Sequence, residues 1–395
     1  MRIDQARAAV EHGHSLNAFI SLTTEAGEGV VVAVKDLVDV AGTITTGGTA
    51  PGVLNIEPAA ADARVVAEIR RHGGLVVGKT NLHELAFGVT SENEHWGPVR
   101  NPRDPERVAG GSSGGSAAAV VAGMCDWAIG TDTGGSVRIP AAFCGCVGFK
   151  PTLGLVSTEG VFPASRSQDV VGPLAADVRT AARALEMMTG QPFGEVKPLD
   201  REPRLAVPAG WIDDLDEPTQ RSWGSASAGL PKIDFGNRNE LAATSIAILA
   251  WEFFQVHRER FEREPDRLGF SAREGLGFVS QIRSEEAYGA ALGRRLELSR
   301  LADERLAGFD ALLLPTTPRI APRIGESAPG VAALLTRFTV PFNVTGQPVV
   351  NVPGPAGDGE LPVGIQVVGR RGEDAGLLAV AAVLEARWAA VRAPE

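Results

Sequence analysis

Residues Gly110–Pro151 read GGSSGGSAAAVVAGMCDWAIGTDTGGSVRIPAAFCGCVGFKP. Two serine-bearing glycine clusters, Gly110–Ser116 and Gly130–Ser136, flank the small apolar run that starts at Ala117. Glycine at this density is typical of backbone that needs positive φ or close approach to another chain segment. A flexible Gly/Ser linker would not adjoin apolar segments of this kind, so the stretch indicates an ordered loop. Its many N–H groups and hydroxyls would suit an oxyanion or a phosphate.

The sequence on either side of this stretch alternates between strand and helix patterns. Gly29–Val40 is a β-branched run typical of a strand buried on both faces, and Lys35 falls where that strand would end. Asp62–Gly73 has helical spacing with a glycine stop, and Leu75–Thr80 is a second short strand. Later segments add strand patterns at 311–315, 349–353 and 362–368, and helical patterns at 177–190, 241–263, 284–307 and 374–392.

Strands near both ends with helices between them predict an α/β layered fold. No internal repeat or linker interrupts the chain, so we expect a single domain over residues 1–395. The middle, 191–309, is interpreted as a helical and irregular elaboration of that domain. Residues 81–109 form a polar, proline-punctuated loop of a length that is often functional. Its aromatic side chains Phe87 and Trp96 are candidates either for a pocket wall or for the core.

Composition excludes several classes of protein. The chain has 395 residues, 44% hydrophobic and 22% charged, and a net charge of −10, which argues against binding nucleic acid or an anionic membrane. The N-terminus lacks the apolar region of a secretory signal, and no uncharged apolar run is long enough to span a bilayer. Three cysteines, Cys125, Cys144 and Cys146, suggest neither a disulfide framework nor a metal site. We therefore expect a cytoplasmic protein without a metal or an organic cofactor.

The serines allow more than one chemistry. Gly110–Gly114 matches the G-x-S-x-G elbow of α/β-hydrolase esterases, which need a downstream acid and histidine. His257 is the one histidine after Ser112, and it lies in a helical pattern. Gly73–Thr80 matches the sequence pattern of a phosphate-binding loop, but the residues between its glycines are typical of a β-strand rather than of a loop. A serine nucleophile with a base other than histidine fits the sequence better than either reading.

A lysine can act as that base if it is neutral. Its usual pKa is about 10.4, and burial or nearby cations lower it by disfavouring the charged form. Lys35, at the end of an apolar strand, is the first candidate. Lys79 and Lys150 also follow apolar segments and are its rivals.

These segments resemble the amidase signature family of serine hydrolases, which use a Ser–Ser–Lys triad. The resemblance rests on GGSSGGSAAAVVAG and GTDTGGSVRIPAAFCGCVGFKPT, with 136 − 112 = 24 residues between the two serines, and on VVAVKDLVDVAG around Lys35. Three C-terminal pieces, ALLLPTTP, NVTGQPVVNVPG and LPVGIQVVGR, are also similar to the family's strands. The match covers about 28–190 and 310–385. It implies the family fold, a mixed central β-sheet covered by helices on both faces.

The resemblance also implies roles for individual residues. Ser136 would be the nucleophile, Ser112 a bridging serine that follows a cis peptide bond, and Lys35 the base that draws the proton from Ser136 through Ser112. Asp132 and Arg138 bracket the nucleophile, either as an ion pair that braces the loop or as substrate contacts. Backbone N–H groups would form the oxyanion hole, and the resemblance assigns them to Thr133, Gly134, Gly135 and Ser136.

The implied function is amidohydrolase activity on a small-molecule amide through a seryl acyl-enzyme, with no cofactor. The family's alternative is the glutaminase-type component of a tRNA-dependent amidotransferase, which works with partner chains. We expect instead a small free-standing amidase, which acts without partner chains of other kinds and could form a homodimer. The substrate is not indicated, although a basic side chain in the acyl pocket would favour an acidic one. Arg283, Arg294 and Arg337 are candidates for that side chain.

Overall fold

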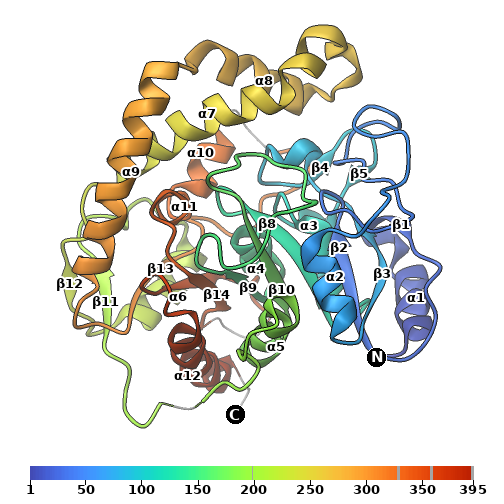
Figure 1. Cartoon of the computed structure of the whole chain (residues 1–395). Coiled ribbons are helices and arrows are strands. Elements are labelled where there is room, and N and C mark those ends of the chain that lie inside the picture. The colour runs from blue at the N-terminus through green and yellow to red at the C-terminus, as the bar shows by residue number, and fades with distance from the viewer. Residues whose placement is uncertain (198, 327–329, 356–358, 393–395) are drawn as a thin grey trace.

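In the part of the chain that the structure describes, eleven strands form one mixed β-sheet that runs through the molecule (Figure 1). The computed structural model describes residues 1–197, 199–326, 330–355 and 359–392. Strand β2 is parallel to β3 and β8, β11 is parallel to β12 and β13, and the other neighbours are antiparallel. The strands in sheet order are β1 (Phe19–Leu22), β3 (Gly74–Thr80), β2 (Val30–Lys35), β8 (Trp127–Asp132), β10 (Val170–Ala175), β9 (Val147–Lys150), β14 (Val349–Pro353), β15 (Gly364–Val368), β13 (Ala311–Pro315), β11 (Leu205–Pro208) and β12 (Lys232–Ile233).

Helices cover both faces of this sheet, as predicted. Side chains alternate along β2: Val32 and Val34 enter one hydrophobic core, whereas Val31 and Ala33 enter a second core on the opposite face. The α-helices are α1 (Ile3–His12), α2 (Arg64–Arg71), α3 (Gly114–Val121), α4 (Arg138–Cys144), α5 (Val178–Thr189), α6 (Glu217–Ser227), α7 (Arg238–Arg263), α8 (Phe270–Ile282), α9 (Glu285–Arg305), α10 (Val331–Thr336), α11 (Pro341–Thr345) and α12 (Asp374–Arg392).

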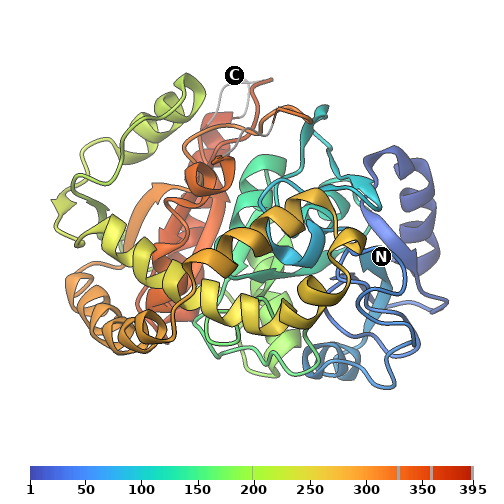
Figure 2. The ribbon, with the colours of Figure 1, turned by 90° about the horizontal axis from the view of Figure 1, so that it is seen from above.

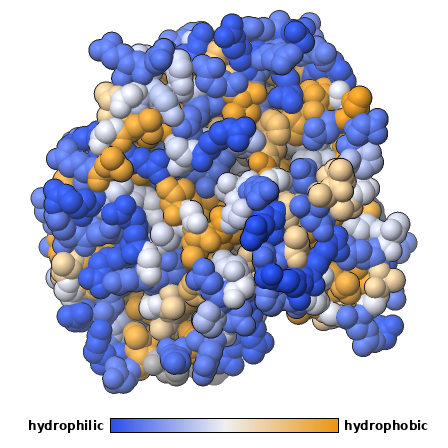
Figure 3. Space-filling view, viewed as in Figure 1, coloured by the Kyte–Doolittle hydropathy of each residue, from blue (hydrophilic) through white to orange (hydrophobic). Residues whose placement is uncertain are grey.

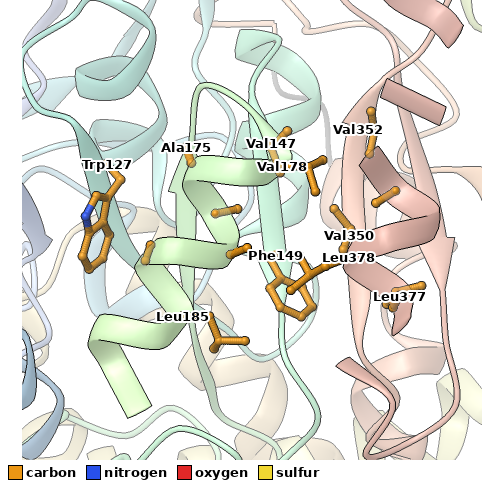
Figure 4. Packing of buried hydrophobic residues seen from close by; sticks show 14 of the residues in the cluster. Trp127, Val147, Phe149, Ala175, Val178, Leu185, Val350, Val352, Leu377 and Leu378 are labelled. Atoms are coloured by element: carbon orange, nitrogen blue, oxygen red, sulfur yellow. The ribbon is translucent and has the colours of Figure 1, made fainter. Parts of the chain in front are cut away.

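The largest hydrophobic core lies between the sheet and helices α2, α5 and α12 (Figure 4). Phe149 on β9 and Val350 on β14 point into this core together with Leu378 of α12. On the opposite face, α1, α3 and α4 cover the N-terminal strands, and α7, α9 and α11 cover the C-terminal ones. The sheet is therefore fixed from both sides, which holds the ends of β2 and β8 in place.

The middle of the chain contains more regular structure than the sequence indicated. Residues 191–240, part of the middle segment that we expected to be helical and irregular, contribute strand β11, the edge strand β12 and helix α6, although proline and glycine obscure the pattern. Helix α8 was not predicted from the sequence. Two glycines, Gly275 and Gly277, interrupt it, and two of its large apolar side chains, Phe270 and Phe278, are exposed, so its sequence lacks a regular helical pattern of apolar residues. Helices α7, α8 and α9 form an arm along the upper and left edge in Figure 1, and Figure 2 shows it crossing over the middle of the molecule.

Two further regions complete the fold. The loop 81–109 contains the 3₁₀ turn η2 (Glu84–Ala86) and two short hairpins, β4 (Glu92–Asn93) with β5 (Gly97–Pro98), and β6 (Arg100–Asn101) with β7 (Asp104–Val108). The three cysteines are free and buried. Within the described residues, every helix is too short or too polar to cross a membrane.

Phe149 allows a test of this packing. It is fully buried in the core between the sheet and α5, so Phe149→Ala should lower the free energy of unfolding by about 3–5 kcal/mol. The matched control is Leu296→Ala on α9, where the leucine is 74% exposed and the change should stay within about 0.5 kcal/mol. Chemical denaturation of both variants measures the difference, and similar losses would contradict the packing described here.

Candidate active site

Lys35 is the last residue of β2, and its side chain is completely buried. Its Nζ atom donates hydrogen bonds to Ser112 Oγ at 2.7 Å and to Thr131 Oγ1 at 2.8 Å. Burial lowers the pKa of Lys35 to about 7, although the carboxylates of Asp132 and Asp169 act in the opposite direction. The amine therefore exists in both charged and neutral forms near neutral pH.

Ser112 follows a cis peptide bond from Gly111, at the turn that leads into α3. Its carbonyl accepts hydrogen bonds from the backbone N–H of His83 at 3.1 Å and from the hydroxyl of Ser91 at 3.3 Å. A Cβ atom at Gly111 would lie 2.9 Å from backbone atoms of residues 89–91, so only glycine fits beside this loop. The long loop 81–109 thus holds Ser112 against Lys35.

Ser136 lies in the short loop 133–137 between β8 and α4 and lines a cavity. Its carbonyl accepts a hydrogen bond from the N–H of Ser113 at 3.2 Å, which joins the two glycine-serine clusters. Within the described residues, the Ser136 hydroxyl makes no hydrogen bond, including to Ser112 Oγ. Gly135 has φ of 127°, and a Cβ there would lie 2.4 Å from Thr339 Oγ1, so this loop position also requires glycine.

The backbone N–H groups of this loop fall into two sets. Those of Thr133, Gly134 and Ser136 donate to no protein atom in the part of the chain that the structure describes. The N–H of Gly135, in contrast, donates to Asp132 Oδ1 at 2.9 Å. Three of the four groups assigned to an oxyanion hole are therefore available to a ligand, and the fourth is already bonded.

Asp132 and Arg138 form a buried ion pair beneath the loop. Arg138 Nε and Nη2 donate to the two carboxylate oxygens of Asp132 at 2.9 and 2.8 Å. Burial alone would raise the pKa of Asp132, but Arg138 and the amide of Asn343 hold it well below its usual range. Arg138 also donates to Asn343 Oδ1 at 2.7 Å and to Gln366 Oε1 at 2.8 Å, linking the loop to α11 and β15.

The structure separates Lys35 from its two rivals. Lys79 forms a fully buried ion pair with Asp36, at 2.8 Å, and donates to Thr45 Oγ1 at 3.0 Å. Lys150 is buried, and burial together with Arg138 lowers its pKa to about 7. Its Nζ donates to the carbonyl of Pro151 at 3.1 Å. Among the described residues, Lys35 is the lysine that is hydrogen-bonded to a serine hydroxyl.

His257 does not have the surroundings of a catalytic histidine. Both of its ring nitrogens are buried without a hydrogen-bond partner in the described residues. Its ring packs against Phe253 and Phe162, with centroids 4.3 and 5.5 Å away, and burial lowers its pKa to about 3. Because a Ser-His-Asp site needs an acid that orients the histidine, the structure does not support the esterase alternative.

Sequence reasoning missed two buried groups beside the site. His83 Nδ1 accepts the N–H of Ser91 at 3.2 Å, and burial lowers the pKa of His83 to about 4, so the ring is neutral at pH 7. Asp169 accepts the hydroxyl of Thr133 at 2.5 Å, and burial raises its pKa to about 6. The sequence offered one indication that His83 lies near the site, namely its position in the long loop 81–109. It offered no indication for Asp169.

A cavity of about 400 Å³ opens at Ser136 and continues between α7, α8 and α10. Phe87 lines it as one of the predicted wall residues, whereas the indole N–H of Trp96 donates to the carbonyl of Thr49 at 2.9 Å, away from the lining. Figure 3 shows hydrophobic side chains gathered toward the middle of this face of the molecule and hydrophilic ones around them. The cavity is lined by Ala86, Phe87, Gly88, Val89, Thr133, Gly134, Ser136, Ala164, Arg238, Asn239, Ala242, Ile246, Leu249, Ala250, Phe278, Val279, Ala332, Ala333, Thr336, Arg337 and Val340.

The three arginines considered from sequence have different surroundings. Arg337 lines the cavity. Arg283 stacks on Phe254 instead, and Arg294 pairs with glutamates on the surface. No group of three or more histidine, cysteine or acidic side chains in the described ranges is arranged to hold a metal ion.

Comparison with known proteins shows which family this chain is similar to. The sequence model of the Amidase family matches residues 5–208 and 234–378. The A subunit of the glutamyl-tRNA(Gln) amidotransferase of Methanothermobacter thermautotrophicus is 34% identical over 397 residues, covering 93% of this chain and 87% of the relative.

Solved structures agree with this match. A crystal structure of an amidase superposes with a TM-score of 0.86 at 33% identity, covering 98% of this chain and 95% of that one. The A subunit of the glutamyl-tRNA(Gln) amidotransferase of Thermotoga maritima gives a TM-score of 0.79 at 32% identity, covering 96% and 90%. The chain belongs to the amidase signature family and is an enzyme that hydrolyses amide C–N bonds.

Proposed function

We propose that the enzyme hydrolyses a small-molecule amide through an acyl-enzyme on Ser136, with Ser112 relaying the proton to Lys35. The observation that carries this proposal is the fully buried Lys35 amine, 2.7 Å from the Ser112 hydroxyl. A neutral amine at that position can accept a proton, and burial makes the neutral form accessible near pH 7.

In the first step, Ser136 Oγ attacks the amide carbonyl carbon. Its proton moves to Ser112, while the proton of Ser112 moves to Lys35. The Ser136 hydroxyl has no competing hydrogen bond in the described structure, so it is free to turn toward the substrate. Catalytic hydrogen bonds in substrate-free enzymes are often long and tighten in the complex, and we expect the contact between the two hydroxyls to form in this way.

The negative charge on the carbonyl oxygen needs hydrogen-bond donors in a water-poor site. The unpaired N–H groups of Thr133, Gly134 and Ser136 would supply them. Gly135 would contribute its N–H only by giving up its bond to Asp132. We therefore assign the oxyanion hole mainly to the first three groups.

Collapse of the tetrahedral intermediate breaks the C–N bond, and the proton held by Lys35 returns through Ser112 to the leaving amine. Water then attacks the ester carbonyl, giving up a proton along the same route. The acyl group leaves as a carboxylic acid, and Ser136 is regenerated. This cycle consumes one water for each amide bond cleaved.

Similarity to the amidotransferase relatives supports a second candidate, in which this chain works within a complex of several different chains. Affinity purification from the native host, followed by measurement of mass in solution, separates the two candidates. A stable complex with other amidotransferase chains that is needed for activity would favour the second. Full activity of the isolated monomer or homodimer on small amides would favour the first.

Replacement of the nucleophile is the first test of the mechanism. Ser136→Ala should lower the hydrolysis of small primary amides by at least about 10³-fold, because no other group can form the acyl-enzyme. It should also abolish labelling by a fluorophosphonate, with little change in thermal unfolding. Ser21→Ala, at an exposed position of β1, is the control and should retain activity and labelling. Substantial turnover by Ser136→Ala would rule out this nucleophile.

The pH profile tests the base. Because Lys35 acts in its neutral form, kcat/KM should rise about tenfold per pH unit below pH 7 and level off above its pKa of about 7. Lys150 has a similarly lowered pKa, so Lys150→Met is the matched control and should keep the inflection. Loss of the inflection in Lys150→Met, or a wild-type rate that rises only near pH 10, would contradict the assignment of Lys35.

We also propose that Asp132 and Arg138 brace the nucleophile loop. Arg138→Met would leave a buried carboxylate unpaired and should lower the free energy of unfolding by about 3–5 kcal/mol. Arg300→Met removes an exposed ion pair with Glu304 on α9 and should cost less than about 1 kcal/mol. Denaturant titrations compare the two variants. A stable Arg138→Met protein that has lost only substrate affinity would favour a substrate contact instead.

A further inference from the structure

The described residues that line the cavity beside Ser136 carry charge of one sign only. Among its lining residues, Arg238 at the start of α7 and Arg337 just after α10 are the charged side chains, and none is aspartate or glutamate. The rest of the lining is apolar apart from a few hydroxyl, amide and backbone groups. A substrate ammonium group would find no carboxylate there, whereas a substrate anion would meet two guanidinium groups.

Arg337 keeps an unused hydrogen-bond donor. Its Nε is buried and has no partner in the described residues, and its side chain is 16% exposed. Its Nη2 donates to the backbone carbonyls of Asp213 and Asp214, the latter at 2.8 Å, and its guanidinium nitrogens lie 3.7 Å from the nearest carboxylate oxygens of the same two residues. Those distances are long for ion pairs, so the two aspartates only partly neutralise Arg337.

The surrounding ion-pair cluster has an excess of positive charge. It joins three arginines, Arg238, Arg319 and Arg337, to the two aspartates Asp213 and Asp214, a formal sum of 3 − 2 = +1. The aspartates are 58% and 64% exposed, so water screens their share of the interaction. A carboxylate that entered from the cavity would supply the missing negative charge on the less solvated side.

The segment that follows Arg337 contacts the nucleophile loop. Two residues after Arg337, the hydroxyl of Thr339 donates to the carbonyl of Gly134 in that loop at 2.5 Å. Thr336 and Val340, on either side of this segment, line the same cavity as Ser136. Ser136 and Arg337 therefore line one cavity, so a single ligand with an apolar body between its two ends can contact both.

We infer that the substrate is an amide whose short apolar body ends in a carboxylate, and that Arg337 binds this carboxylate in the cavity wall. The inference rests on the proposed function, because it takes Ser136 as the point at which the amide reacts. It assigns Arg337 to substrate selection.

The first experiment compares substrates of equal length and different charge. The wild-type enzyme is assayed with monoamides of straight-chain dicarboxylic acids of four to eight carbons, with the neutral alkyl amides and with the ω-amino amides. The best carboxylated amide should exceed its neutral counterpart in kcat/KM by about tenfold or more, as one charged hydrogen bond provides, and the cationic amide should be the poorest. Equal rates for anionic and neutral amides would overturn the inference.

The second experiment compares two arginines of the same cluster. Arg337→Met should lower the preference for the carboxylated amide by about tenfold or more, mainly through a higher KM. Arg319→Met is the control, since Arg319 pairs with Asp214 at 2.7 Å but does not line the cavity, and it should keep the preference. Arg337→Lys, which retains the charge, should recover part of it. Retention of the full preference by Arg337→Met would overturn the role of Arg337.

The outcomes also separate this inference from the proposed function. Circular dichroism and fluorophosphonate labelling of Ser136 show whether each variant is folded. If Arg337→Met does not fold, the test uses Arg337→Lys, which should lose part of the preference for the carboxylated amide; retention of the full preference would then overturn the role of Arg337. Hydrolysis of neutral amides through Ser136 without a carboxylate preference would refute the inference alone. If no amide is cleaved and Ser136 is not labelled, the proposed function fails as well.

Discussion

The whole site depends on one amine held out of water. Lys35 occupies the end of a strand in the interior of the sheet, where its Nζ donates hydrogen bonds, among the described residues, to the hydroxyls of Ser112 and Thr131 alone. Hydroxyls stabilise a charged amine less than water or a carboxylate would, so burial dominates and the pKa falls to about 7. A carboxylate in direct contact, as Asp36 is with Lys79 at 2.8 Å, would favour the charged form of Lys35 and oppose its action as a base.

The neighbouring strand brings the other half of the site to this amine. Strand β8 lies beside β2 and delivers Thr131 to Lys35, and the loop that follows β8 carries Ser136. Below that loop, the Asp132–Arg138 pair connects it to α11 and β15 on the C-terminal half of the sheet. Helices α7, α8 and α10 line the cavity that opens at Ser136, so residues from both halves of the chain form its wall.

The sequence predicted the layered fold, the strand that ends at Lys35 and the two serine clusters, because these depend on local pattern and on long motifs. It could not choose between Lys35, Lys79 and Lys150 without the family resemblance, since each follows an apolar segment. The choice depends on which strand lies next to β8, and that is a tertiary property. Helix α8 and the position of Arg337 in the cavity wall escaped prediction for different reasons. Glycines interrupt the helical pattern of α8. The position of Arg337 depends on segments distant in the chain, such as Asp214, whose carbonyl accepts a hydrogen bond from Arg337 and which lies 123 residues earlier.

The protonation of Lys35 is the most direct measure of this account. The chain has only five lysines, so labelling lysine with ¹⁵N at Nζ and comparing spectra with a Lys35→Ala variant identifies the Lys35 signal. Titration of that signal should show a midpoint near pH 7, with the neutral form dominant above it. A midpoint near 10.5, the ordinary value for lysine, would show that Lys35 stays charged and cannot serve as the base.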